Sequence, residues 1–323
     1  MFKHKLFTLL AAGCCLLPVA QAQDATRKYP SHSVTVIIPF PPGGTLDTVG
    51  RMLAQRLGEQ TGQTFVVENR AGAGGVIGGQ AVARANPDGY TLLFSASTFA
   101  MAPMVAKGAV YDVDRDFKAI ALVAKAPLSV AVSKSVPAKN VAELVAYGKA
   151  QPGGLKMAIG SVASAGHLAV ELLKSKSGVD YTVIQYKGSS PAYNDLIGGR
   201  IDGFIDPILG SVQFAKAGQL NVLAVTSAAR VPSMPEVPTV GETYPGYEFY
   251  SWYGLWAPAK VPEVIAEFLN AEVNKALTTD MDARLRAQGL LPTPGSMADF
   301  RQFQTNDMAV VQKLITEGGI RGE

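Results

Sequence analysis

The sequence is poor in the residues that usually carry out catalysis. Its only cysteines are Cys14 and Cys15, and its only histidines are His4, His32 and His167. We expect both cysteines to be removed with an N-terminal segment. The mature chain would then have no disulfide, thiolate nucleophile or cysteine metal site. No two histidines have the spacing of a metal site, so we expect no bound metal and no cofactor.

The N-terminal segment has the three parts of a secretory signal. Lys3 and Lys5 form a short basic region, residues 6–17 are apolar, and Ala20-Gln21-Ala22 is a cleavage site. The apolar run is too short to span a bilayer, so residues 1–22 are predicted to be a signal peptide and not an anchor. Gly13-Cys14 leaves lipid anchoring at Cys14 as an alternative, although Ala11 stands where that pattern prefers a larger aliphatic residue. A buried N-terminal helix is a second alternative.

The chain also lacks a strong charge of either sign. The full sequence has a net charge of +3, and losing Lys3 and Lys5 leaves 27 basic residues against 26 acidic ones. We find no basic block with interleaved aromatic residues, so nucleic acid is excluded as a partner. With 48% hydrophobic and 17% charged residues, the chain is predicted to be globular and compact.

Short β-branched runs alternate with helical patterns, which predicts an α/β fold with largely parallel sheets. The expected strands are residues 34–40, 64–68, 90–95, 155–160, 181–185, 203–206, 220–226 and 252–257. The expected helices are residues 46–57, 141–149, 261–277 and 281–288, the last one capped by Asp280.

The order of these elements indicates two lobes. Two extended apolar segments, residues 120–132 and 220–226, flank a complete set of strands and helices. We expect them to be the strands that cross between the lobes. Domain 1 would then comprise residues 23–125 and 228–323, domain 2 would comprise residues 126–227, and the protein would be a monomer.

The turn Pro41-Pro42-Gly43-Gly44 joins the first predicted strand to the first predicted helix. The amides of Gly44, Thr45, Leu46 and Asp47 would lie at the helix N-terminus without helical partners, where they can bind an anion. The alternative is an ordinary tight turn in which Asp47 only complements the helix dipole.

Two enzyme classes have weaker support. The glycine cluster at residues 72–79 resembles a dinucleotide fingerprint, but its spacing differs and no carboxylate lies between Asp88 and Asp112 to hold a ribose. A hydrolase would combine Ser161 or Ser164 with His167, but no nucleophile elbow surrounds either serine. A locally bonded histidine in a helical first turn is the simpler interpretation of His167.

Polar turns follow several predicted strands. Ser95, Ser97 and Thr98 end one strand, Ser161 and Ser164 follow another, and residues 186–190 follow a third. Each alone is typical of a helix cap. Together they predict a polar cleft at the carboxyl ends of parallel strands, where open α/β sheets bind ligands.

Several motifs resemble one family. The turn Pro41-Pro42-Gly43-Gly44 with Asp47, and residues 67–75, 87–93 and 251–258, are similar to the solute-binding receptors of tripartite tricarboxylate transporters, the Bug receptors. The resemblance covers nearly the whole mature chain. It implies a non-enzymatic periplasmic protein with the two-lobed (Venus flytrap) fold of type II binding proteins, which closes on a small organic acid.

The resemblance also implies a site. Residues 42–47 and 161–166 would hold the ligand carboxylate from opposite lobes. From the residues alone, Phe40, Asp206 and Trp252 are candidates to shape the far end of the pocket, where Asp206 would attract an ammonium or repel a second carboxylate. Ser161 and Ala163 stand where the family usually has glycine, and their side chains are expected to narrow the pocket or to alter which acid it prefers. The predicted binding residues are Phe40, Pro42, Gly43, Gly44, Thr45, Leu46, Asp47, Ser97, Thr98, Ser161, Ser164, Ala165, Gly166 and Asp206.

The predicted function is capture of a small carboxylate, either an organic acid or an amino acid, and its delivery to a membrane permease of the tripartite tricarboxylate type. Two alternatives stay open. One is a sensing receptor that signals to a membrane kinase, and the other is a serine hydrolase.

Overall fold

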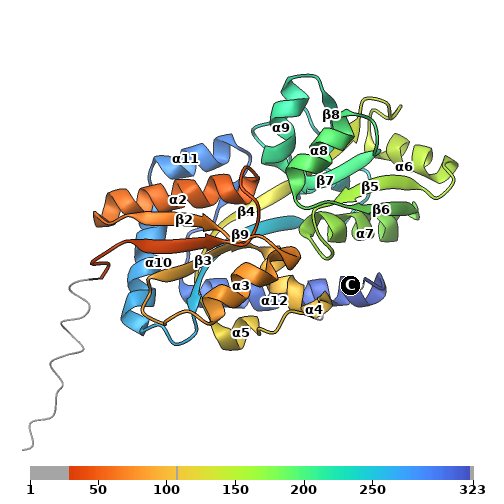
Figure 1. Cartoon of the computed structure of the whole chain (residues 1–323). Helices are drawn as coiled ribbons and strands as arrows, with labels where there is room; N and C mark the ends of the chain where they lie inside the picture. The colour runs from red at the N-terminus through yellow and green to blue at the C-terminus, as the bar shows by residue number, and fades with distance from the viewer. Residues whose placement is uncertain (1–28, 107, 321–323) are drawn as a thin grey trace, which may run out of the picture.

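The computed structural model describes residues 29–106 and 108–320 (Figure 1). The predicted signal peptide and Cys14 lie outside these residues. The strands are β1 (Val34–Ile38), β2 (Phe65–Asn69), β3 (Thr91–Ala96), β4 (Phe117–Ser133), β5 (Leu155–Ile159), β6 (Tyr181–Gln185), β7 (Gly203–Pro207), β8 (Leu220–Val225), β9 (Tyr250–Pro258) and β10 (Leu291–Pro292). The helices are α2 (Thr45–Thr61), α3 (Val76–Ala83), α4 (Ser97–Val105), α5 (Val113–Asp116), α6 (Val141–Ala150), α7 (Ala165–Ser177), α8 (Ser189–Ile197), α9 (Ile208–Lys216), α10 (Glu263–Leu277), α11 (Asp280–Ala287) and α12 (Met297–Glu317). Within the described ranges, no helix is long and apolar enough to cross a membrane.

The α/β prediction is confirmed, but the sheet is mixed and not largely parallel, because β4 pairs antiparallel with β7, β8, β9 and β10. This long strand, β4, organises the fold. The strand order is β2-β1-β3-β9-β4-β7-β5-β6, with β8 and β10 also paired to β4. Residues 117–127 of β4 pair with β9, and residues 128–133 pair with β7 and β8. We call the part around β1, β2, β3 and β9 the first lobe, and the part around β5, β6, β7 and β8 the second lobe. Figure 1 shows the two side by side, with β4 passing from one to the other.

One of the two predicted crossing strands is wrong. Residues 120–132 do cross, as part of β4, but β8 pairs with β4 at residues 129–133 and stays in the second lobe. The chain returns to the first lobe through the segment that leads into β9. A buried apolar strand has the same sequence pattern whether it crosses between the lobes or stays in one of them, so the pattern alone could not distinguish the two cases.

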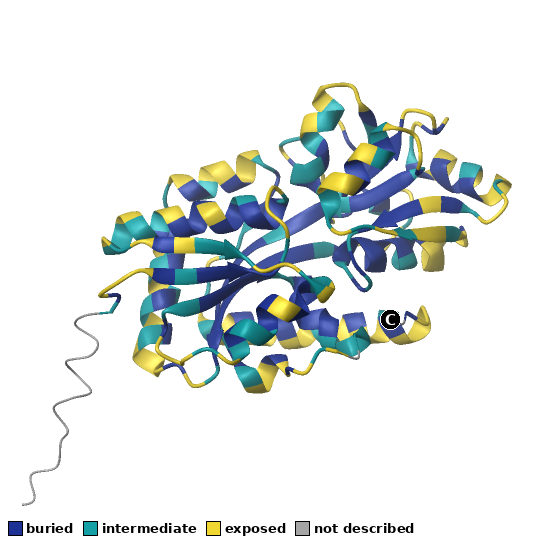
Figure 2. Ribbon diagram, viewed as in Figure 1, coloured by how far each residue is buried: buried dark blue, intermediate teal, exposed yellow. Residues whose placement is uncertain are grey.

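Each lobe has its own hydrophobic core, visible as the buried interior in Figure 2. In the first lobe, Leu46, Val49, Leu53 and Leu57 form an apolar stripe at helical spacing along α2 and pack against the first-lobe strands. Burying each such side chain contributes roughly 1.5–3 kcal/mol. The stripe therefore fixes which face of α2 meets the sheet, and with it where the helix N-terminus points.

Two C-terminal segments join the cores. In α12, Phe300 packs in the first-lobe core, whereas Val311 and Ile315 pack in the second. Tyr247 and Phe249, just before β9, also pack in the second-lobe core. The boundary expected at residue 227 therefore remains a prediction about which segments move together.

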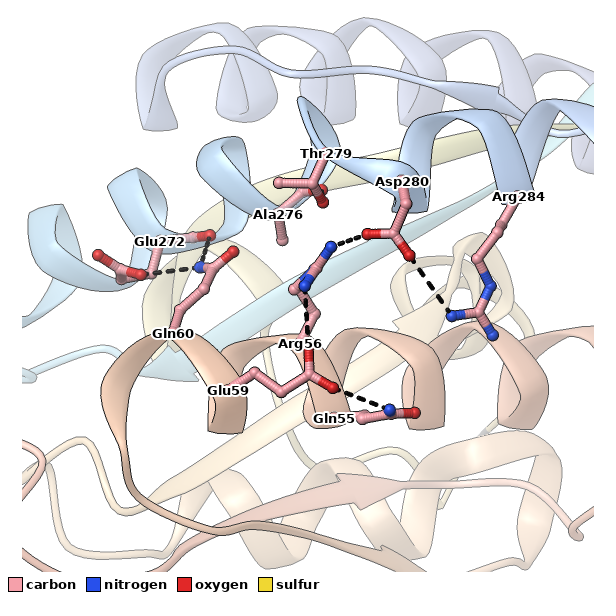
Figure 3. A network of polar contacts seen from close by, with 9 residues as sticks. All are labelled: Gln55, Arg56, Glu59, Gln60, Glu272, Ala276, Thr279, Asp280 and Arg284. Atoms are coloured by element: carbon pink, nitrogen blue, oxygen red, sulfur yellow. Dashed lines mark hydrogen bonds and ion pairs between the residues drawn. The ribbon is translucent and has the colours of Figure 1, made fainter.

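A polar network holds the C-terminal half of α2 against α10 and α11 (Figure 3). Arg56 forms an ion pair with Asp280, and Gln60 donates hydrogen bonds to the side chain and the carbonyl of Glu272 at 2.8 and 2.9 Å. Asp280 is the first residue of α11, so the prediction that it caps this helix is wrong by one residue; the N-cap is Thr279. These contacts anchor α2 at one end and leave its N-terminus to face the other lobe.

Candidate ligand-binding cleft

A cleft of about 190 Å³ lies between the lobes, at the carboxyl ends of β1, β3, β5, β6 and β7. The N-terminal turns of four helices border it: α2 and α4 from the first lobe, and α7 and α8 from the second. Helix α9 reaches the lining only through its N-cap, Pro207. Twelve of the fourteen predicted residues line it: Phe40, Pro42, Gly44, Thr45, Leu46, Asp47, Thr98, Ser161, Ser164, Ala165, Gly166 and Asp206. Their roles in binding remain predictions.

Two of the predicted residues do not line the cleft. The amide of Gly43 is turned toward Asp47, to which it donates at 3.1 Å. Ser97 is fully buried, with its Oγ 3.5 Å from that of Ser251. Trp252, expected near the far end of the pocket, is buried in the first-lobe core and donates to Asp307 at 2.7 Å.

The first-lobe side of the cleft is the turn between β1 and α2. Gly43 has φ +91°, a backbone conformation that glycine adopts readily and other residues adopt rarely. Gly44 is the N-cap of α2, with φ −86°. The first helical hydrogen bond runs from the Thr48 amide to the Gly44 carbonyl at 3.0 Å. The amides of Thr45, Leu46 and Asp47 therefore have no helical acceptor and are available to an anion.

Asp47 holds this turn in place. Its carboxylate accepts hydrogen bonds from the Gly43 amide, from Arg51 Nε at 3.0 Å and from Asn69 Nδ2 at 2.9 Å. Burial alone would raise the pKa of Asp47, but the hydrogen bonds from Arg51, Asn69 and Gly43 outweigh burial and lower it. Asp47 is thus ionised at neutral pH, and its carboxylate is hydrogen-bonded to three groups of the protein. Its role in the turn therefore goes beyond a favourable interaction with the helix dipole.

The second-lobe side is the start of α7. Ser164 is the N-cap, and its Oγ accepts from the His167 amide at 3.3 Å. The amides of Ala165 and Gly166 lie in the first turn, where no helical acceptor exists for them. A Cβ on Gly166 would lie 2.0 Å from the carbonyl oxygen of Ile205, so only glycine lets α7 begin this close to β7.

The two residues that stand at positions where the family usually has glycine, Ser161 and Ala163, lie beside the cleft. Ala163 has φ +54°, a left-handed conformation that favours glycine. Ser161 lines the cleft, and its Cβ lies 3.9 Å from the position of a Cβ on Gly74 across the cleft. Pro41 and Gly188 approach similarly, with 3.8 Å between Pro41 Cγ and a Cβ built on Gly188. The rims of the two lobes therefore nearly touch at two points.

The serine–histidine pair lacks hydrolase geometry. The His167 ring is buried, and its Nδ1 lies 3.2 Å from the Ala163 amide, from which it accepts. Burial lowers the pKa of His167, so the ring is neutral at pH 7. Among the described residues, no hydrogen bond joins this ring to the Oγ of Ser161 or Ser164. The local bonding expected for His167 is thus observed.

The glycine cluster at residues 72–79 serves packing. A Cβ on Gly78 would lie 2.6 Å from the Cβ of Pro39, and one on Gly79 would lie 3.0 Å from the Phe99 ring. These glycines let α3 pack closely against the end of β1 and against α4. In the described part of the chain, no group of His, Cys, Asp and Glu is placed to hold a metal ion.

The family follows from sequence comparison. A family model described as "Tripartite tricarboxylate transporter family receptor" matches residues 49–320. The chain belongs to this family. Protein BugT of Bordetella pertussis is 34% identical to this receptor, with 93% of each chain covered. The family consists of periplasmic solute-binding receptors, and the resemblance stated from the motifs is confirmed.

Solved structures agree on the fold. A structure titled "R. palustris Rpa4515 with adipate" is 35% identical, with a TM-score of 0.86 over 91% of this receptor and 99% of that chain. MatC from Rhodopseudomonas palustris, with bound malate, is 30% identical, with a TM-score of 0.82 over 88% and 99% of the two chains. The receptor therefore has the fold of these periplasmic binding proteins.

Sequence reasoning missed part of the cleft wall. Residues 187–191, which lead into and begin α8 in the second lobe, line the cleft, as do Ser251 and Tyr253 from β9 in the first lobe. Residues 186–190 had been singled out as a polar turn, but not assigned to the site. Lys187 is the one cationic residue of the lining, and it is exposed. Partial positive charge in the lining is therefore supplied mainly by the helix N-termini.

Asp206 stands at the end of β7 and is half-buried on the cleft wall. Its Oδ1 accepts from Ser189 Oγ at 3.1 Å and its Oδ2 from Tyr193 Oη at 3.3 Å. Burial raises the pKa of Asp206 to about 7, although both hydrogen bonds oppose this rise. The wall of the cleft thus contains a carboxyl group that is partly protonated at neutral pH.

Proposed function

We propose that this receptor captures a small carboxylate between its lobes and delivers it to a membrane transporter of the tripartite tricarboxylate type. The observation that carries the proposal is the convergence of helix N-termini from both lobes on one cleft. A single helix N-terminus stabilises an anion by about 0.3–1 kcal/mol, and more when partly buried. Several are needed for useful affinity, and a ligand held by both sides favours the closed arrangement.

The lining suits a ligand that must later be released. It offers amides and hydroxyls in place of a bidentate arginine, and its single lysine is exposed. Amide contacts from two lobes separate when the lobes part, which weakens them together. We propose that two bodies move relative to each other when the lobes close. The first comprises residues 23–125 and 228–323, and the second comprises residues 126–227. We also propose that the receptor acts as a monomer.

The size of the cleft favours a small ligand. About 190 Å³ is below the roughly 300–1,000 Å³ typical of sites for drug-sized molecules. The structures titled with adipate and malate hold small dicarboxylates. Adipate and malate are therefore the first probes, with glutamate as an amino-acid probe.

Calorimetric titration of the mature receptor with these three acids tests the proposal. Ser164→Ala is expected to weaken binding about tenfold, because the loss of the N-cap disturbs the amides of Ala165 and Gly166. Ser296→Ala is the matched control, because Ser296 caps α12 in the same way and does not line the cleft. Equal affinities of the two variants, or no binding of any acid, would contradict the proposal.

A second experiment separates transport from sensing, since both functions read out lobe closure. Purification of the ligand-bound receptor from membranes is expected to recover a tripartite transporter permease. Recovery of a sensor kinase alone would instead support the sensing receptor.

A further inference from the structure

Asp206 lines the cleft, and the side chains that hydrogen-bond to its carboxyl group are uncharged. Ser189 and Tyr193 from α8 donate to its two oxygens, and Ser129 from β4 bonds to its main-chain carbonyl at 3.4 Å. On α9, a Cβ built on Gly210 would lie 3.1 Å from Asp206 Oδ2, so the helix starts directly against the carboxyl group. The carboxyl is held in one orientation without the help of a cation.

The titratable groups that face Asp206 are few. Tyr193 and Tyr253 have raised pKa values, mainly through burial and partly through Asp206, so both are neutral. Lys187 lines the cleft and is exposed, and Asp47 across the cleft is paired with Arg51. Within the described residues, no ion pair includes Asp206. Its protonation therefore responds mainly to what enters the cleft.

A dicarboxylate brings a second negative charge into this space. The lining amides of α2 and α7 suit one carboxylate, and the other end of a short diacid must lie along the remaining wall, to which Asp206 belongs. Two carboxylates in contact share one proton, because a like charge raises the pKa of its neighbour. The proton comes from solvent, and no covalent bond of the ligand changes.

We propose that Asp206 takes up one proton when a dicarboxylic acid binds, and that the protonated oxygen donates a hydrogen bond to the second carboxylate of the ligand. This inference rests on the proposed function, whose ligand class it narrows. Asp206 is then the residue that selects diacids with a carboxylate at the distal end, and the receptor binds its ligand together with a proton.

An ammonium group is the other natural partner of a carboxylate, and the observations disfavour it. The N-terminal turns of four helices border the cleft, and their partial positive charges oppose a cation. The two partners also predict opposite pH dependences. An ammonium ligand would bind more tightly as Asp206 ionises, whereas a diacid binds less tightly.

The test is calorimetry with adipate and malate in two buffers of different ionisation enthalpy. At pH 8 the wild-type receptor is expected to take up close to one proton per ligand. Affinity is expected to change little from pH 6 to 7 and then to fall by up to about tenfold per pH unit, since Asp206 must regain its proton to bind. The mono-amides of the same acids have no distal carboxylate and are expected to bind without proton uptake.

Asp206→Asn keeps a donor at this position and is expected to bind both diacids with neither proton uptake nor the fall above pH 7. Asp180→Asn is the matched control, because Asp180 is exposed and pairs with Lys174 away from the cleft. It is expected to behave as wild type. Diacid binding without uptake, or equal uptake with the mono-amides, would overturn this inference alone, and the mono-amide comparison needs no variant to fold. A wild-type receptor that binds no acid at any pH would overturn the proposed function and this inference with it.

Discussion

Asn69 donates a hydrogen bond to Asp47 at 2.9 Å and, from the same amide nitrogen, a second one to the carbonyl of Phe40 at 3.0 Å. Arg51 completes the arrangement by donating to both Asp47 and Asn69. The end of β2 therefore fixes the turn after β1, although Asn69 itself does not line the cleft. Asn69 acts as a positioning residue for the first-lobe side of the site.

Asn69→Ala is expected to loosen this turn. The change leaves the Phe40 carbonyl and one oxygen of Asp47 without a donor, at a cost of about 1–3 kcal/mol. Affinity for adipate or malate, measured by calorimetry, should fall about tenfold because the amides of α2 lose their fixed direction. Asn221→Ala in the second lobe is the control, since Asn221 contacts Lys134 away from the cleft. Unchanged affinity in Asn69→Ala would contradict the positioning role.

Gly43 and Gly44 form a matched pair for testing backbone conformation. A Cβ at either position meets no atom within 4 Å, but Gly43 has φ +91° and Gly44 has φ −86°. Gly43→Ala is expected to destabilise the receptor by roughly 1–2 kcal/mol, as L-residues resist this conformation, and Gly44→Ala much less. Thermal unfolding without ligand measures both. Equal losses would mean that the positive φ of Gly43 does not constrain the turn.

The sequence predicted most strands because β-branched runs mark them wherever they lie, and it predicted residues 120–132 as a crossing segment. It also predicted most residues of the two turns that face the cleft, because free helical amides follow from strand, turn and helix alone. Which face of β9 meets the cleft depends on how the two lobes are assembled, and the local sequence does not encode it. Trp252 and Tyr253 are neighbours on β9 and point to opposite faces. For this reason the sequence placed Trp252 near the cleft, whereas the structure places Tyr253 there and buries Trp252 in the core.

Ser97 and Gly43 do not line the cleft for a similar reason. Both lie in turns that reach the cleft, but their polar groups are used internally, by Ser251 and Asp47. Pairing between residues 154 positions apart, as for Ser97 and Ser251, depends on the assembled sheet. A sequence motif predicts where a turn lies in the chain, but it does not predict the hydrogen-bond partner of each polar group in that turn.

His167 is expected to make the receptor sensitive to acid. Burial lowers its pKa below 6.5, so below that pH the unfolded chain binds a proton that the folded chain does not. Stability should therefore fall as pH drops from 6.5 through the folded pKa. His167→Asn, which keeps an acceptor for the Ala163 amide, should reduce the loss of Tm between pH 6.5 and 5. The exposed His32→Asn variant serves as control, and a loss of Tm as large in His167→Asn as in wild type would refute the assignment.

Asp206 should affect stability in the opposite direction, even without ligand. Its pKa rises from 3.8 to about 7 on folding, so between these values the folded receptor holds a proton that the unfolded chain has lost. Stability should decrease as pH rises from about 4 to about 7, and the penalty should then stay constant. Asp206→Asn removes the charge but keeps the shape, so it should raise Tm at pH 8 by a few degrees more than at pH 4, since about 1 kcal/mol shifts Tm by roughly 2–4 °C. Differential scanning calorimetry at both pH values measures this, with Asp180→Asn as the exposed control. A variant whose Tm follows that of the wild type at both pH values would show that folding does not raise the pKa of Asp206, whatever the ligand does.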